Sequence, residues 1–210
     1  MQTLDRPRRI LACAIAALAG YVDAIGYLSV GGYFVSFMSG NTTRLATDLA
    51  RDTRLALTPL LLISGFVGGV AISRALVAKA GRLRKPSVLA MVTALLAAGY
   101  FARQAESPTM ALGAMVLAMG ALNNTFHRGE VPIGLTYMTG ALVRIGQGIG
   151  ERIIGRTSTG LFLFLGLWLS LASGAIAGAF VFARFDNASL GYAVVASGAL
   201  CLCSFAIPNR

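Results

Sequence analysis

Six long apolar stretches, separated by polar segments, dominate the pattern of hydrophobic and polar positions along the chain. Each contains at most one ionisable residue, and most reach the roughly 20 residues that an α-helix needs to cross the hydrocarbon core of a bilayer. The stretches are residues 10–30, 55–73, 87–102, 107–126, 157–183 and 188–208. The first is about twice as long as the apolar region of a secretory signal peptide, so we interpret it as a permanent helix. The pattern predicts six transmembrane helices.

Composition supports a membrane protein and argues against a soluble domain. Of the 210 residues, 56% are hydrophobic and only 12% are charged, and the mean hydropathy is +0.73. Soluble domains carry about 25% charged residues. The net charge of +10 lies in loops beside the apolar stretches, where basic residues set membrane orientation, and no basic domain is left to bind nucleic acid. We therefore expect an all-α integral membrane protein.

Two polar segments, residues 33–54 and 133–156, interrupt the apolar pattern. In the first, Gly31 and Gly32 precede a strand-like aromatic run, and a stretch without glycine or proline then predicts a helix up to Arg54. The candidate N-cap residues are Ser39, Asn41 and Thr42 in this segment and Thr139 in the second, which has Pro132 at its start. A half-helix can enter to mid-bilayer and return, so we expect broken or re-entrant segments, with full crossing as the alternative.

The chain contains an internal repeat with an offset of 100 residues. Residues 36–40, Ser-Phe-Met-Ser-Gly, match residues 136–140, Thr-Tyr-Met-Thr-Gly, by identity or close chemistry. Three further pairs fall at the same offset: Gly20 with Gly120, Asp23 with Asn123, and Arg44 with Arg144. The repeat divides the chain into a first membrane repeat, residues 1–105, and a second, residues 106–210. Chance similarity among abundant Gly, Ser and Ala is the alternative.

Positive charge indicates how the two repeats are oriented. If the polar segments do not cross, each repeat has three crossings and the second is inverted; if they cross, each has four and the repeats are parallel. With six crossings and the N-terminus in the cytoplasm, 13 of the 18 basic residues lie inside. Those outside are Arg44, Arg51, Arg54, Arg103 and Arg184. Because basic residues concentrate on the cytoplasmic side, we predict two inverted three-helix repeats with both termini in the cytoplasm.

Inverted half-helices would direct their N-termini toward each other near the midplane, where backbone N–H groups and the helix dipole attract anions. The predicted substrate-binding residues are Asp23, Ser39, Gly40, Asn41, Arg44, Thr139, Gly140 and Arg144. The two glycines would bring backbone close to a ligand, or would only let two helices cross. Each arginine would face the ligand, or would snorkel or pair with a nearby carboxylate, Asp48 in the first repeat and Glu151 in the second.

Asp23 lies inside the first apolar stretch, where an ionisable group is costly and indicates a functional site. It would carry protons or cations, or would form an internal salt bridge with Arg44. The equivalent residue of the second repeat, Asn123, is neutral. Any titration at this position would therefore belong to the first repeat.

Chemistry other than transport finds little support in the sequence. The sequence contains no nucleotide-binding loop, no metal-binding cluster of His and Cys, and no nucleophile paired with a base. We therefore expect no enzyme activity, no catalytic residues, no cofactor and no metal. The expected partners are the lipid bilayer and a small-molecule or ion substrate, with a homo-oligomer as an open alternative and no nucleic acid.

Two motifs of the first repeat carry a family resemblance. Gly20-Tyr21-Val22-Asp23-Ala24 is followed by an aromatic segment, Gly32-Tyr33-Phe34-Val35, and then by Met38-Ser39-Gly40-Asn41. With these motifs the chain resembles the YoaK family of bacterial inner-membrane proteins, a domain family of unknown function whose pattern is G-x-x-D-A, an aromatic segment and M-T-G-N. Ser39 stands where threonine is usual. The resemblance covers essentially the whole chain; it implies a multi-spanning bacterial inner-membrane protein and supplies no substrate.

The predicted half-helices also look like the core of sulfate-permease-type and uracil-permease-type carriers, in architecture only. We therefore expect a secondary transporter or channel for a small solute, with an anion favoured and proton coupling through Asp23 as an option. The alternative is a non-transporting membrane scaffold or accessory subunit, whose polar segments serve packing or partner binding. A polar cavity at the midplane would favour transport, and a dry packed interface would favour the scaffold.

Overall fold

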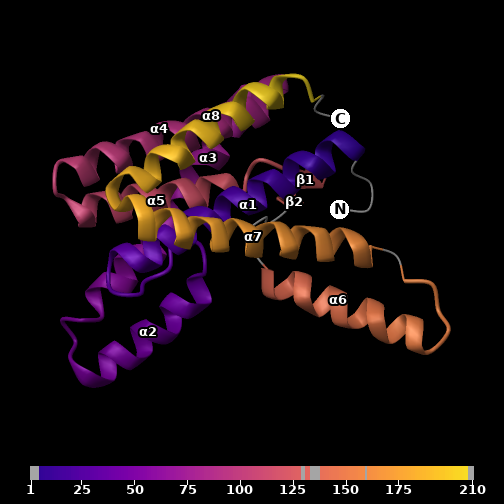
Figure 1. Ribbon diagram of the computed structural model, residues 1–210, viewed down its shortest axis with the longest axis horizontal. Coiled ribbons are helices and arrows are strands. Elements are labelled where there is room, and N and C mark those ends of the chain that lie inside the picture. Colours follow the sequence, from indigo (N-terminus) through magenta and orange to yellow (C-terminus); the bar gives the residue numbers. More distant parts are fainter. Residues whose placement is uncertain (1–4, 129–130, 133–137, 159, 208–210) are drawn as a thin grey trace.

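The computed structural model describes residues 5–128, 131–132, 138–158 and 160–207, which form eight α-helices and one short hairpin (Figure 1). The helices are α1 (Arg6–Ser29), α2 (Met38–Arg51), α3 (Leu57–Ala80), α4 (Arg84–Gln104), α5 (Pro108–Leu122), α6 (Met138–Ile153), α7 (Leu161–Phe185) and α8 (Ser189–Phe205). Two 3-10 turns, η1 (Gly81–Leu83) and η2 (Asp186–Ala188), join α3 to α4 and α7 to α8. Strands β1 (His127–Arg128) and β2 (Val131–Pro132) form an antiparallel hairpin.

The six apolar helices α1, α3, α4, α5, α7 and α8 correspond to the six predicted membrane stretches, which confirms the all-α membrane fold class. Three helical stretches of the described chain are long and apolar enough to cross a membrane: Arg6–Ser29, Leu57–Gln104 and Leu161–Phe205. The last two contain 48 and 45 residues, and each bends at its 3-10 turn into two helices. The predicted end of the second stretch, residue 73, was seven residues too early, since α3 continues to Ala80. Arg74 and Lys79 end the apolar pattern there but are themselves good helix formers.

Proline and glycine mark several helix boundaries. Pro108 lies in the first turn of α5, where a missing N–H is tolerated and the fixed φ suits a helix. Gly81 has a φ of +50° directly after α3, and Gly160 has a φ of +96° directly before α7. Side chains with a Cβ rarely adopt this conformation, so glycine lets the chain turn sharply into the next helix.

The core lies along α1 and α5, which carry the largest share of the buried apolar residues. α1 packs closely on α7, because a Cβ on Gly20 would collide with the carbonyl oxygen of Leu171 and one on Gly174 with that of Ala17. α5 packs on α3 in the same way, with Gly120 against the backbone of Phe66. Small residues of this kind let helix backbones approach in lipid. The first apolar helix of each predicted repeat therefore packs on the second apolar helix of the other.

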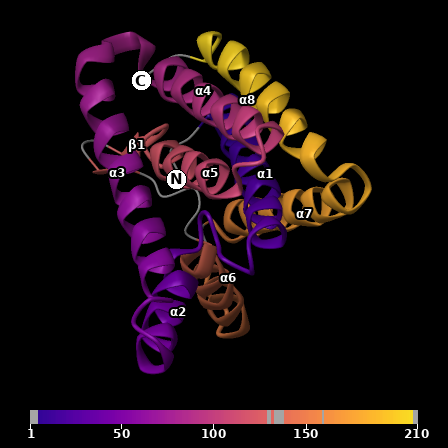
Figure 2. The same cartoon turned by 90° about the vertical axis from the view of Figure 1, so that its left-hand side faces the viewer.

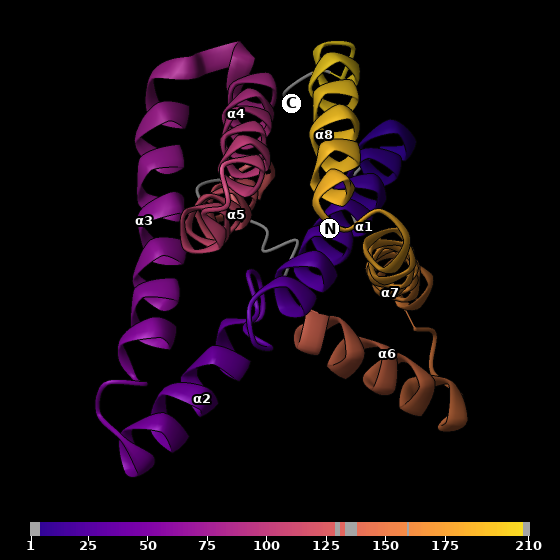
Figure 3. The same ribbon diagram turned by 60° about the vertical axis from the view of Figure 1, so that its left-hand side comes forward.

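The two polar helices, α2 and α6, lie outside this helical core and diverge from one another (Figures 1 and 3). In Figure 1 their N-terminal ends lie toward the middle of the molecule, and their C-terminal ends diverge toward its two ends. Figures 2 and 3 show both helices on the same side of the bundle, α2 packed beside α3 and α6 beside α7. With 14 and 16 residues, they are about 21 and 24 Å long, too short to cross a bilayer.

Two local predictions were wrong. α2 begins at Met38 and α6 at Met138, so Ser39, Asn41, Thr42 and Thr139 lie within the first turns and are not N-caps. In α2 the preceding residue, Phe37, is the N-cap and has no side-chain capping bond. The aromatic run 33–37 does not form a strand; the backbone groups of Phe34, Val35 and Ser36 bond to side chains of α1 and α2.

Candidate functional site

The centre of the candidate site is the bent segment, which we define as residues 31–37 between α1 and α2. The chain leaves α1 through Gly31 and Gly32, which have φ angles of +60° and +78°. The glycine break was predicted, and these angles explain why glycine is needed. Non-helical backbone inside a membrane protein requires partners for its N–H and C=O groups, and three polar side chains supply them.

Asp23 of α1 binds the bent segment at its buried end. Its Oδ1 atom accepts hydrogen bonds from the backbone N–H groups of Val35 and Ser36, each 2.8 Å long. Val35 is fully buried and packs on Gly26 one turn further along α1. The carboxylate thus satisfies two donors that no helix or strand provides for.

Asn41 of α2 binds the middle of the same segment. Its Oδ1 accepts the N–H of Phe34 at 3.1 Å, and its Nδ2 donates to the carbonyl oxygen of Phe34 at 2.7 Å. The side chain is fully buried. The amide therefore imitates a neighbouring peptide group and pairs both backbone groups of one residue.

Arg44 of α2 binds the start of the segment. One guanidinium nitrogen, Nη1, donates to the carbonyl oxygen of Gly32 at 2.8 Å, and the guanidinium lies 4.5 Å from the centre of the Tyr33 ring. Among the described residues it forms no ion pair with Asp23 or Asp48, so both pairing alternatives were wrong. Asp23 and Arg44 instead bind different parts of the bent segment and do not contact each other as an ion pair.

The other predicted site residues contribute less to this centre. Ser39 is exposed, and a Cβ on Gly40 would meet the rings of Phe34 and Phe37, so both roles considered for this glycine stay predictions. In the second repeat, Thr139 and Arg144 are exposed on α6, and Gly140 lies in its first turn. No hydrogen bond or ion pair between described residues joins these second-repeat residues to the first set.

In the second repeat, the sequence places two asparagines, Asn123 and Asn124, at and after the position equivalent to Asp23, and both make hydrogen bonds within the described residues. Asn123 donates to the carbonyl oxygen of Met119 at 3.0 Å. The next residue, Asn124, crosses to α3, where its Nδ2 donates to the carbonyl oxygen of Val70 at 2.8 Å and to the hydroxyl of Ser73 at 2.7 Å. Tyr137 and the rest of residues 133–137 lie outside the described residues, so the matching motif 136–140 is compared from Met138 onward.

An open cavity of about 300 Å³ lies beside the bent segment, between α1 and α7. Asp23, Tyr27 and Phe34 line it, together with glycine, alanine and leucine residues of the two helices. The rings of Tyr27 and Phe34 lie 4.9 Å apart. Asp23 therefore has two contacts: its Oδ1 holds the segment, and its side chain borders the cavity.

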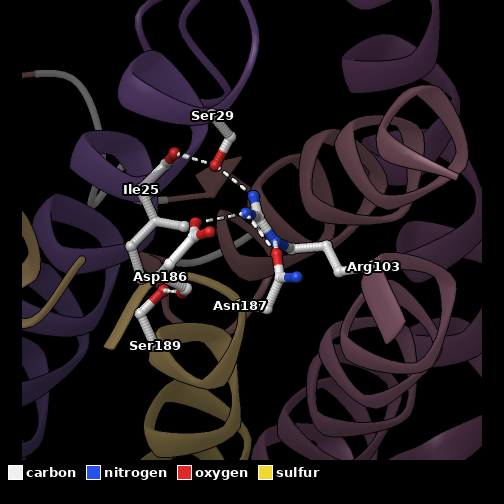
Figure 4. A network of polar contacts seen from close by, with 6 residues as sticks. All are labelled: Ile25, Ser29, Arg103, Asp186, Asn187 and Ser189. Carbon is white, nitrogen blue, oxygen red and sulfur yellow. Dashed lines mark hydrogen bonds and ion pairs between the residues drawn. The ribbon is translucent and has the colours of Figure 1, made fainter. Parts of the chain in front are cut away.

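Sequence reasoning missed a polar cluster at one end of the bundle (Figure 4). Arg103 of α4, nearly buried, donates to Asn187 Oδ1 at 3.0 Å from Nε and 2.7 Å from Nη2. It also forms an ion pair with Asp186 at 2.9 Å and donates to the hydroxyl of Ser29 at the end of α1. An arginine at the end of one apolar stretch and an Asp-Asn pair in the short turn of another are the only signals that the sequence offered.

Among the described residues, no group of three or more His, Cys, Asp or Glu side chains is placed to hold a metal ion. The features at the site are therefore a carboxylate, aromatic rings and a locked segment of non-helical backbone.

The helices and the site define a multi-spanning α-helical membrane protein in which a segment of non-helical backbone is bound to the first helix. The chain belongs to the family described as "Protein of unknown function (DUF1275)", whose profile matches residues 11–207. It is 39% identical to UPF0700 transmembrane protein RA0705 of Rhizobium meliloti, over 99% of this chain and 96% of that protein. It is 28% identical to UPF0700 transmembrane protein YoaK of Bacillus subtilis, over 74% of this chain and 73% of that protein. These matches confirm the resemblance to the YoaK family. No solved structure matches.

Proposed function

We propose that this protein is a secondary transporter or channel for a small solute, located in the bacterial inner membrane. The observation that carries the proposal is the cavity at Asp23, which borders non-helical backbone within the span of α1. At about 1.5 Å per residue, Asp23 lies about 9 Å along the helix from Ser29, the end of α1. Broken helices beside a cavity are the usual substrate sites of secondary transporters.

The proposed topology has six crossings, two inverted repeats at residues 1–105 and 106–210, and cytoplasmic termini. Two observations support it. The Arg103 cluster joins the ends of α1, α4 and α7, which lie on one side in a six-crossing protein but on both sides in an eight-crossing one. The N-terminal ends of α2 and α6 lie toward the middle of the molecule, as expected for two half-helices that meet there (Figure 1).

Asp23 is the proposed proton-binding group. An ionised carboxylate inside a membrane protein requires strong compensation, which can come from donors, a cation or a proton. Two N–H donors compensate one oxygen, and no described cation forms an ion pair with the carboxylate. A proton or a cationic solute in the cavity would complete the compensation.

The predicted anion site between residues 39–44 and 139–144 stays a prediction. At the N-terminus of α2, the N–H groups of Met38, Gly40 and Asn41 bond to backbone oxygens within the same turn. Arg44 is engaged by Gly32 and Tyr33. The N-terminus of α2 therefore offers few free hydrogen-bond donors to an anion.

The competing proposal is a membrane scaffold or accessory subunit without enzyme activity. On α6, Gly146 and Gly150 have the G-x-x-x-G spacing, and no atom lies within 4 Å of the position that a Cβ would take. Such open small-residue faces favour helix association in lipid, with a second copy or another membrane protein.

Flux through proteoliposomes tests the transport proposal. Liposome volume would be followed by light scattering after mixing with sodium formate, sodium acetate, methylammonium chloride, urea or glycerol, at several pH values. We expect at least one solute to enter faster than in protein-free liposomes, with a pH dependence that Asp23→Asn removes and Asp48→Asn keeps. Asp48 is a matched control, since it is a buried carboxylate of α2 outside the cavity lining. Rates equal to those of empty liposomes for the whole panel, with folded protein, would support the scaffold.

A further inference from the structure

We propose that the cavity beside Asp23 binds a compact organic cation, an ammonium group carried on a small apolar or aromatic body. The inference rests on the proposed function and names the class of its solute. It departs from the anionic solute that the half-helix pattern favoured, because the residues that line the cavity have the opposite charge.

Charge at the cavity is set by one group. Asp23 is the only Asp, Glu, Lys, Arg or His residue among its described lining. Arg44 of α2, which binds the bent segment, is directed to Gly32 and the Tyr33 ring and does not line the cavity. Arg103 is engaged by Ser29, Asp186 and Asn187 at the end of the bundle. A cation entering the cavity therefore meets a carboxylate and no opposing positive side chain in its described lining.

Aromatic rings complete a cation site. Tyr27 and Phe34 border the cavity, with ring centres 4.9 Å apart and planes inclined by 38°. The negative face of an aromatic ring attracts an ammonium group, more strongly when water is excluded. The backbone of Phe34 is held in place by both hydrogen bonds of Asn41, so its position is fixed before a ligand arrives.

The rest of the lining selects against inorganic ions. A bare metal cation needs about six oxygen ligands, whereas this cavity offers one carboxylate among glycine, alanine, leucine and aromatic side chains. Such a lining suits a ligand with carbon on most of its surface. A volume of about 300 Å³ lies at the small end of ligand pockets, which points to a compact amine.

Three ligands of one shape and different charge test the inference. Benzylammonium, benzyl alcohol and benzoate share one ring, and their binding to the purified protein would be measured by thermal stabilisation and equilibrium dialysis. We expect benzylammonium to bind and stabilise the protein, and the other two to bind at least about tenfold more weakly, because neither brings a positive charge to the Asp23 carboxylate. This comparison uses the unmodified protein, so it does not depend on any variant folding.

Three variants locate the site. Asp23→Asn keeps an oxygen that accepts the Val35 and Ser36 N–H groups but removes the charge, and should weaken benzylammonium at least about tenfold. Phe34→Leu keeps the apolar surface and should weaken it about two- to fivefold through loss of the cation–π contact. Asp48→Asn, outside the lining, should leave the affinity within about twofold.

The outcomes separate this inference from the proposed function. Binding of benzoate in preference to benzylammonium, equal binding of all three, or full benzylammonium affinity in Asp23→Asn would each overturn the cation site. Asp23-dependent binding of benzylammonium without any flux would uphold the cation site and contradict the proposed transport function. Flux of another solute, with no benzylammonium binding, would overturn the cation site and uphold the transport proposal.

Discussion

Arg103 hydrogen-bonds Asn187, a residue 84 positions away, through two guanidinium nitrogens. The contact joins the last turn of α4, in the first predicted repeat, to the turn between α7 and α8, in the second. Because both residues lie at the same end of the helices, they must also lie on the same side of the membrane.

The first prediction concerns this topology. In a variant without native cysteines, Arg82→Cys at η1 should react only with reagent supplied from the cytoplasmic side. Ala188→Cys at η2 should react only from the opposite side. Membrane-impermeant maleimide on oriented vesicles measures both. Labelling of the two positions from one side would eliminate the six-crossing arrangement.

The second prediction concerns the stability of the Arg103 cluster. Arg103→Gln should lower the free energy of unfolding by about 2 kcal/mol, because it removes several charge-assisted hydrogen bonds of a nearly buried side chain. Asp186→Asn should change it by less than about 0.5 kcal/mol, since the side chain of Asp186 is 70% exposed. Unfolding in mixed micelles measures both. A coupling energy near zero between Arg103→Gln and Asn187→Ala would show that their contact contributes nothing.

The third prediction concerns Asn41. Asn41→Leu should lower stability by about 2 to 5 kcal/mol, because it leaves the N–H and C=O groups of Phe34 without partners. Thr43→Ala, on the exposed face of the same helix, should change it by less than about 0.5 kcal/mol. If both variants have equal stability, the bent segment is held by other contacts.

The fourth prediction separates the shape of Asp23 from its charge. Asp23→Asn should stay within about 1 kcal/mol of the unmodified protein, since the amide oxygen still accepts the N–H groups of Val35 and Ser36. Asp23→Leu should cost about 2 to 5 kcal/mol because it leaves both donors unsatisfied. Unfolding of Asp23→Asn, reversed by Arg44→Gln, would instead reveal an ion pair between the two side chains.

The fifth prediction concerns the crossing of α1 and α7. Gly20→Ala should destabilise the protein by about 1 to 3 kcal/mol or more, because the new methyl group would collide with the backbone of Leu171. Gly113→Ala is the matched control: no atom lies within 4 Å of its Cβ position, so alanine should be neutral or stabilise α5 by up to about 1 kcal/mol. Equal effects of the two substitutions would mean that the crossing is looser than described.

Much of the fold follows from the sequence because the signals are local. Apolar runs long enough to span a bilayer predicted the six membrane helices, and Gly31 and Gly32 predicted the break after the first. Asp23 was singled out because a charge in an apolar helix is costly. Each inference needs only the residue and its neighbours in the chain.

The site was predicted less well because its contacts depend on distant segments. Asn41 looks like a helix cap in the sequence, yet it binds Phe34 across a bend that only the folded chain defines. Arg103 looks like one more basic residue near a membrane boundary, and its partners lie 74 to 84 positions away. Whether Arg44 meets Asp23 or Gly32 depends on backbone geometry that residue types alone do not encode.

The contacts of Asn41 and Arg44 also decide how this part of the molecule can move. Both side chains belong to α2 and both bind the bent segment, so segment and helix form one stiff arm. The arm is attached to α1 by a glycine pair, which is a natural pivot, and by the hydrogen bonds to Asp23. Any movement of the arm away from α1 must therefore break the bonds at Asp23 as well as the packing of α2 on α3. A group that competes for the Asp23 carboxylate would weaken the first of these two attachments.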